Sequence, residues 1–121
     1  TMKPHPGCMI NPGDYPTLNL KVVMDPLGEI LNEFDVVYSS NLTSASVDAF
    51  LIGLPVVIRL DPTGLNLSPL RGQPGIRFVA TPEELAEALQ IGRQNRVDRR
   101  ENNNFFFVDQ ELPKWRHLLE N

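Results

Sequence analysis

Short apolar runs rich in valine and isoleucine alternate along this chain with longer segments of helical periodicity. Runs of this kind, bounded by Gly, Pro and Asn, predict strands over residues 19–24, 35–38, 55–60 and 76–79. Strands that alternate with helices predict an α/β fold, with a three-layer, Rossmann-like parallel sheet and helices on both of its faces. Ligands of such sheets bind outside the carboxyl ends of the strands.

Capping residues mark where the helices between these strands begin. Asp25-Pro26 predicts the start of one helix, with Asp25 at the N-cap. Its buried face is predicted to hold Leu27, Ile30, Leu31 and Phe34. A second helix is expected from about Ser44 to Ile52, ending at Gly53, which suits a left-handed C-terminal position.

The second half of the chain continues the pattern after a Pro- and Gly-rich loop over residues 61–75. Thr81-Pro82-Glu83-Glu84 predicts a capping box at the start of a third helix, which Gly92 is expected to close. The polar residues 93–104 predict a connection. Residues 105–108 are predicted to form a strand or to pack under a last helix, which is expected from about residue 112 to 120. We expect one α/β domain over residues 1–121.

Composition excludes several classes of function. The formal net charge of −4 argues against general binding of nucleic acid. Cys8 is the one cysteine, so no intrachain disulfide is possible and a reducing compartment is favoured. The longest apolar run, residues 49–58, is too short for a membrane span. We expect a cytoplasmic protein, with the inner face of the membrane as an alternative location.

The chain opens with Thr-Met-Lys-Pro-His-Pro, which resembles neither a signal peptide nor an initiation site. We expect an excised fragment of a larger protein, whose missing N-terminal domain would be its partner. A processed or tag-cleaved whole protein is the alternative. A basic cluster is interpreted as a solvated face, with phosphate or lipid contact as the alternative: Arg93, Arg96, Arg99 and Arg100.

Hydroxyl-bearing residues are concentrated where the second strand is predicted to meet the second helix. Unpaired N–H groups and the helix dipole favour an anion at such a junction. A cap needs only one Ser or Thr, and the excess favours a phosphate site over a simple turn. The candidate phosphate-binding residues are Ser39, Ser40, Asn41, Thr43 and Ser44.

Three further residues are candidates for the same chemistry. Asp48 lies four residues after Ser44 and is suited to accept ribose hydroxyls, or it merely complements the helix dipole. His5 stands between two prolines, where it could bind a leaving phosphate or donate a proton to it; a surface histidine is the alternative. Arg71 could reach a phosphate or carboxylate as a fork donor, and a solvated loop arginine is the alternative. No metal-ligand spacing, glycine-rich nucleotide fingerprint or nucleophile elbow is found, so no metal or cofactor is expected.

Three segments together resemble the C-terminal half of GT-B-fold glycosyltransferases of bacterial surface-polysaccharide synthesis, of the sialyltransferase, Kdo-transferase and glycerophosphotransferase type. They are Lys3-Pro4-His5-Pro6-Gly7, the stretch 34–40 ending in Ser39-Ser40, and the stretch 46–57 with Asp48-Ala49 and Gly53-Leu54-Pro55-Val56. The resemblance covers about residues 3–90. It implies a partial GT-B C-terminal domain that binds the nucleotide of a nucleotide-sugar donor.

The resemblance also implies roles for single residues. His5 would contact the phosphate or support the departing nucleotide, and Ser39 and Ser40 would bind the donor phosphate. Asp48 occupies the place where many relatives have a longer Glu that holds the ribose. The base-bearing N-terminal domain of this fold is absent, so the expected function is donor binding by a part that is inactive alone. The alternatives are a nucleotide-sugar epimerase of the same fold and a non-catalytic interaction domain.

Overall fold

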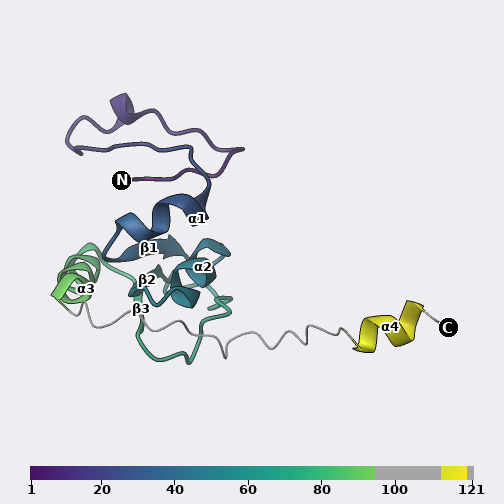
Figure 1. The fold of residues 1–121 in the computed structure, drawn as a ribbon. Coiled ribbons are helices and arrows are strands. Elements are labelled where there is room, and N and C mark those ends of the chain that lie inside the picture. The colour runs from purple at the N-terminus through teal and green to yellow at the C-terminus, as the bar shows by residue number, and fades with distance from the viewer. Residues whose placement is uncertain (95–112, 120–121) are drawn as a thin grey trace. The chain divides into compact units, whose positions relative to one another are not determined.

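The structure is a computed structural model that describes residues 1–94 and 113–119. The chain divides into two compact units, Thr1–Asp35 and Val36–Asn121. The second unit holds a three-stranded parallel sheet with helices against it, which confirms the predicted α/β character (Figure 1). No helix among the described residues is long and apolar enough to cross a membrane.

The first unit begins as an irregular loop that carries one 3-10 turn, η1 (Pro12–Asp14). Met2 and Val22 form an isolated parallel bridge within it. The strand predicted over residues 19–24 is therefore wrong, because the pairing stops after one bridge. Pro4 stands two residues after Met2, where the next ladder donor is needed, and proline has no N–H.

A short helix closes the first unit. α1 (Leu27–Ile30) is followed directly by the 3-10 turn η2 (Leu31–Glu33). Pro26 takes the N-cap position in place of Asp25, with no side-chain capping bond, so the predicted start is off by one residue. The predicted apolar face is confirmed, because its members are buried or half-buried and the residues between them are exposed: Leu27, Ile30, Leu31 and Phe34.

The sheet of the second unit consists of β1 (Val37–Ser40), β2 (Val56–Arg59) and β3 (Ile76–Val79), in the order β1-β2-β3. All pairings are parallel. β2 and β3 were predicted within one residue of their ends, whereas β1 lies two residues later than predicted. Pairing with Ile58 and Arg59 draws the last two residues of β1 into the sheet, although serine favours turns.

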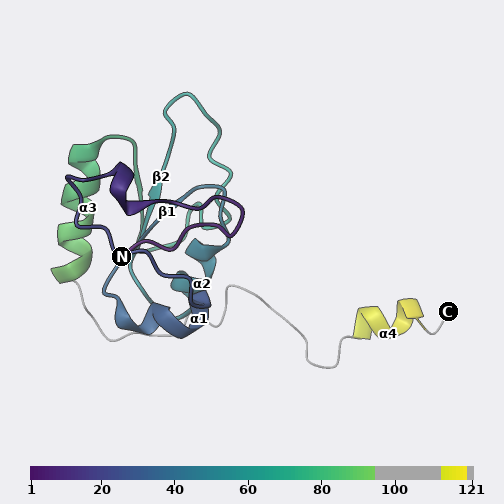
Figure 2. The same cartoon turned by 90° about the horizontal axis from the view of Figure 1, so that it is seen from above.

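Helices lie on opposite sides of this sheet in both views (Figures 1 and 2). α2 (Ala45–Leu51) connects β1 to β2, and α3 (Pro82–Gln94) follows β3. Ala88 of α3 packs on the sheet face that carries Val57 and Val79. Gly53 follows α2 with φ 78°, which confirms its predicted left-handed conformation.

Gly92 does not close α3, which continues to Gln94, and this prediction is wrong. Gly92 is buried, and a Cβ atom at this residue would stand 2.9 Å from Cγ2 of Val36. The glycine therefore allows the helix to approach the chain just before β1 closely. Arg93 and Gln94, expected in the polar connection, are the last residues of α3.

α4 (Pro113–Leu119) confirms the predicted last helix. Its Leu118 and Leu119 are 70% and 82% exposed. The remainder of the predicted connection and the strand predicted over residues 105–108 lie outside the described residues. So do three members of the basic cluster, Arg96, Arg99 and Arg100.

Candidate functional site

The three strands end side by side at one edge of the sheet, which we call the carboxyl edge. The register pairs Ser40 with Arg59, and Arg59 with Val79. The chain leaves this edge through residues 39–44, which we call the serine turn, and through the loop after β2. Since ligands of parallel sheets bind beyond this edge, it carries the candidate site.

The serine turn is folded by its own hydroxyl groups. Oγ of Ser40 accepts a hydrogen bond from the N–H of Leu42 (3.3 Å). The hydroxyls of Ser39 and Thr43 both donate to the carbonyl oxygen of Ser40 (3.4 Å each). Bonds between hydroxyl and carbonyl oxygens are usually about 2.7–2.8 Å long. These contacts are therefore weak, and a phosphate oxygen would make a shorter, charge-assisted bond in their place.

The direction of these bonds distinguishes the three hydroxyls. Ser40 uses a lone pair in its recorded bond, so its own proton is left to donate to a ligand. Ser39 and Thr43 would have to give up a bond first. Ser40 and Thr43 are exposed, and Ser39 is half-buried. Ser40 is thus the best placed of the predicted phosphate ligands.

A buried residue that was not among the sequence candidates fixes the turn. Ser46 is 1% exposed, and its hydroxyl donates to the carbonyl oxygen of Thr43 (3.0 Å). A buried hydroxyl must find a partner, and this one anchors the turn to α2. Ser46 lies between residues of the buried helix face, which is the signal that could have identified it.

Asn41 and Arg71, two predicted ligands, make structural hydrogen bonds. The side-chain amide of Asn41 donates to the carbonyl oxygen of Leu65 (3.2 Å) and so joins the serine turn to the loop after β2. Arg71 donates to the carbonyl oxygen of Asn66 (3.2 Å), within its own loop. Leu70, beside Arg71, is 0% exposed and ties that loop to the core.

Ser44 and Asp48 occupy the first turn of α2. Ser44 is the N-cap residue but has helical φ and ψ (−72° and −17°) and makes no side-chain capping bond. Its carbonyl oxygen accepts from the N–H of Asp48 (3.2 Å). Both side chains are exposed and one helical turn apart, as the predicted ribose and phosphate contacts require. α2 has only seven residues, so its dipole contributes little here.

Arg59 is the residue that the sequence reasoning missed. It ends the otherwise buried β2, is exposed, and lies beside Ser40 in the register. The pKa of Asp61 lies below its usual value, first because the backbone N–H and then the hydroxyl of Thr63 donate to it (2.9 and 2.7 Å). The positive charge of Arg59 lowers this pKa further. The sequence signal was a lone charge at the end of an apolar strand.

No family model, curated protein or solved structure matches this chain.

His5 lies in the first unit, in a turn that fixes its ring. Its Nδ1 atom accepts from the N–H of Gly7 (3.0 Å), and its carbonyl oxygen accepts from the N–H of Cys8 (2.9 Å). With Nδ1 as the acceptor, the neutral ring carries its proton on Nε2, and the side chain is exposed. The predicted contact of His5 with a phosphate stays a prediction.

The described residues contain no group of three or more His, Cys, Asp or Glu side chains arranged to hold a metal ion. What the carboxyl edge offers is a set of exposed hydroxyls beside a guanidinium group. Hydroxyl and guanidinium donors of this kind bind phosphate and carboxylate oxygens.

Proposed function

We propose that this chain is the donor-nucleotide-binding part of a GT-B-fold glycosyltransferase of surface-carbohydrate synthesis. The observation that carries the proposal is an exposed, hydroxyl-rich turn at the carboxyl end of the parallel strand β1. Such turns hold the phosphate groups of nucleotides in open α/β sheets. The ligand is a nucleotide-sugar, or a nucleotide linked to a polyol phosphate.

The path of α3 supports a Rossmann-like arrangement for this proposal. α3 lies on the opposite side of the sheet from α2, and its end comes back to Val36, just before β1. In doubly wound sheets the helices change sides where the strand order reverses, and nucleotides bind at that point. A further strand placed beside β1 would put the serine turn at such a point.

The chemistry follows from the donors available. Departure of the nucleotide leaves negative charge on its phosphate, and preorganised donors that meet this charge lower the barrier. In the proposal, the Ser40 hydroxyl supplies such a donor, while Asp48 accepts a bond from the ribose. The displacement is direct, with the acceptor hydroxyl supplied and deprotonated by another part of the enzyme.

Titration of the isotope-labelled chain with CMP, CDP, UDP and GDP tests the proposal. We expect at least one nucleotide to shift the amide signals of residues 39–48, because new phosphate bonds replace the weak bonds of the serine turn. Cytidine, which lacks the phosphate, is the matched control and should leave these signals in place. Absence of shifts in residues 39–48 with all four nucleotides would contradict the proposed nucleotide binding.

Exposed leucines favour a second candidate, a non-catalytic interaction domain. Leu42 in the serine turn, and Leu65 and Leu67 in the loop after β2, are 71%, 80% and 62% exposed. The bond from Asn41 to Leu65 holds two of these segments together, so the leucines border the same edge. If His5→Ala and Ser40→Ala leave the activity of the whole enzyme unchanged, this second candidate is the correct one.

A further inference from the structure

Arg59 holds an unusual position for a charged residue. The three residues before it in β2 are 0–1% exposed, yet Arg59 itself is exposed at the strand end. Neighbours in the register lie about 4.8 Å apart and project from the same face of a sheet. Arg59 and Ser40 are such neighbours, so their side chains project from the same face of the sheet at its carboxyl edge.

The acidic side chains recorded at this edge are satisfied by other donors. Oδ1 of Asp61 accepts from the N–H and the hydroxyl of Thr63 (2.9 and 2.7 Å). Oε2 of Glu84 accepts from the N–H groups of Ala80 and Thr81 (2.6 and 3.3 Å). Among the described residues no ion pair joins Arg59 to either carboxylate. Arg59 acts on Asp61 through its charge alone, and the guanidinium fork stays available to a ligand.

We infer that Arg59 and Ser40 together bind a phosphate group of the nucleotide donor. The inference rests on the proposed function and adds a positively charged residue to the proposed nucleotide site. The guanidinium donates two parallel N–H bonds to two phosphate oxygens, and the free proton of Ser40 is donated to a phosphate oxygen as well. Arg59 thus supplies the charge that the hydroxyls of the serine turn lack.

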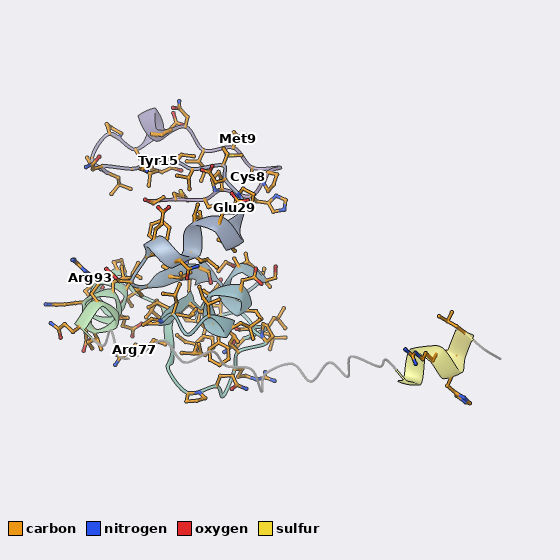
Figure 3. The ribbon with its side chains drawn as sticks, in the orientation of Figure 1. Cys8, Met9, Tyr15, Glu29, Arg77 and Arg93 are labelled. Atoms are coloured by element: carbon orange, nitrogen blue, oxygen red, sulfur yellow. The ribbon has the colours of Figure 1, made fainter. Side chains whose placement is uncertain are left out.

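The chain offers a matched control for Arg59. Arg77 is exposed in the next strand, β3, and is labelled in Figure 3. It pairs with Val57, so it projects from the same face as Arg59 but two residues further from the carboxyl edge. At about 3.3 Å per residue, this places it well back from the serine turn. Both arginines lose the same charge when changed to Gln.

The test measures binding of CDP, CMP and inorganic pyrophosphate to the full 121-residue chain by calorimetry at an ionic strength of about 0.15 M, where exposed charges are screened beyond about 8 Å. We expect Arg59→Gln to weaken CDP binding about 10- to 100-fold, as loss of a charged hydrogen-bonding group does. Arg59→Lys keeps the charge but loses the fork, so its affinity should fall between the two. Arg77→Gln should change the affinity less than about twofold. Amide spectra of each variant check that it is folded.

The outcomes separate this inference from the proposed function. Equal effects of Arg59→Gln and Arg77→Gln, with clear weakening by Ser40→Ala, would overturn the role of Arg59 and leave the nucleotide site standing. Binding of pyrophosphate that needs Arg59, without binding of CDP or CMP, would support the anion site and reject the nucleotide donor. If the wild-type chain binds none of the three probes, both proposals fail.

Discussion

Gly92 of α3 approaches Val36 so closely that a Cβ atom added to the glycine would lie 2.9 Å from Cγ2 of the valine and 3.4 Å from its Cβ. Valine is stiff at χ1 and cannot swing its methyl group aside cheaply. The contact fixes the end of α3 against the chain segment that leads into β1. It therefore links the position of the last core helix to the strand that carries the serine turn.

Gly92→Ala should destabilise the chain. The alanine gains about 1 kcal/mol of helix propensity but overpacks the contact with Val36, at a cost of about 1–3 kcal/mol. We expect a net loss of up to about 2 kcal/mol in the free energy of unfolding, measured by chemical denaturation. Adding Val36→Ala should remove most of this clash, because Cγ2 is then gone. A stability of Gly92→Ala equal to wild type would contradict the close approach.

Gly28→Ala is the matched control for Gly92→Ala, because no atom crowds the added methyl group at residue 28. Gly28 lies in α1, and a Cβ atom there meets nothing within 4 Å. The substitution should raise the free energy of unfolding by about 0.5–1 kcal/mol, through the lower entropy of the unfolded chain alone. Destabilisation in the same denaturation experiment would show that residue 28 is more crowded than the structure indicates.

The start of α3 depends on reciprocal bonds between Thr81 and Glu84. The N–H of Glu84 donates to Oγ1 of Thr81 (3.2 Å), while Oε2 of Glu84 accepts from the N–H of Thr81 (3.3 Å). Thr81→Ala should cost about 1 kcal/mol of stability. Glu83→Ala, an exposed change in the same turn, is the control. Equal losses in the two variants would show that the capping box contributes nothing specific.

The pKa of Asp61 should respond to Thr63. The bonds from Thr63 lower it below 3.8, so the turn they form is intact at neutral pH and weakens only as the pH falls below 3.8. Thr63→Ala removes the hydroxyl donor but keeps the backbone N–H, so it should raise this pKa part of the way toward 3.8. Carboxyl carbon shifts followed by NMR measure the change. Thr17→Ala, far along the chain, should leave the value as it was.

The hydroxyls of the serine turn should differ in their importance for nucleotide binding. Ser40→Ala is expected to weaken binding about 5- to 10-fold, because Ser40 alone of the three donates without losing a bond. Ser39→Ala and Thr43→Ala should have smaller effects, since their protons already bond to the Ser40 carbonyl oxygen. Calorimetric affinities for CDP give the ranking. Thr43→Ala as the most damaging of the three would contradict it.

Much of the fold was predictable because local signals agreed with the tertiary structure. Gly53, the capping box at Thr81 and the apolar face of α1 all occur where the sequence placed them. The wrong predictions have a common cause, which is that a residue distant in the sequence determined the local structure. Pro4 ended the pairing of residues 19–24, and Val36 gave Gly92 a packing role in place of a cap.

The candidate site was predictable in its location but not in its bonding. The run of hydroxyls after a strand pointed to the serine turn, because the carboxyl edge follows from the order of elements. Which hydroxyl donates and which accepts depends on three-dimensional geometry. The sequence therefore did not indicate that Ser40 keeps its proton available for a ligand. Arg59 was missed because its importance arises from the register with β1, which no single segment encodes.

The two edges of the described sheet are unequally protected against association with other chains. β3 exposes Arg77, whose charge opposes the docking of a foreign strand. β1, with the sequence Val-Tyr-Ser-Ser, has no charged side chain to do so. Where no further strand pairs with β1, concentrated preparations of this chain are expected to aggregate through it, and a ligand bound at the serine turn should reduce this aggregation.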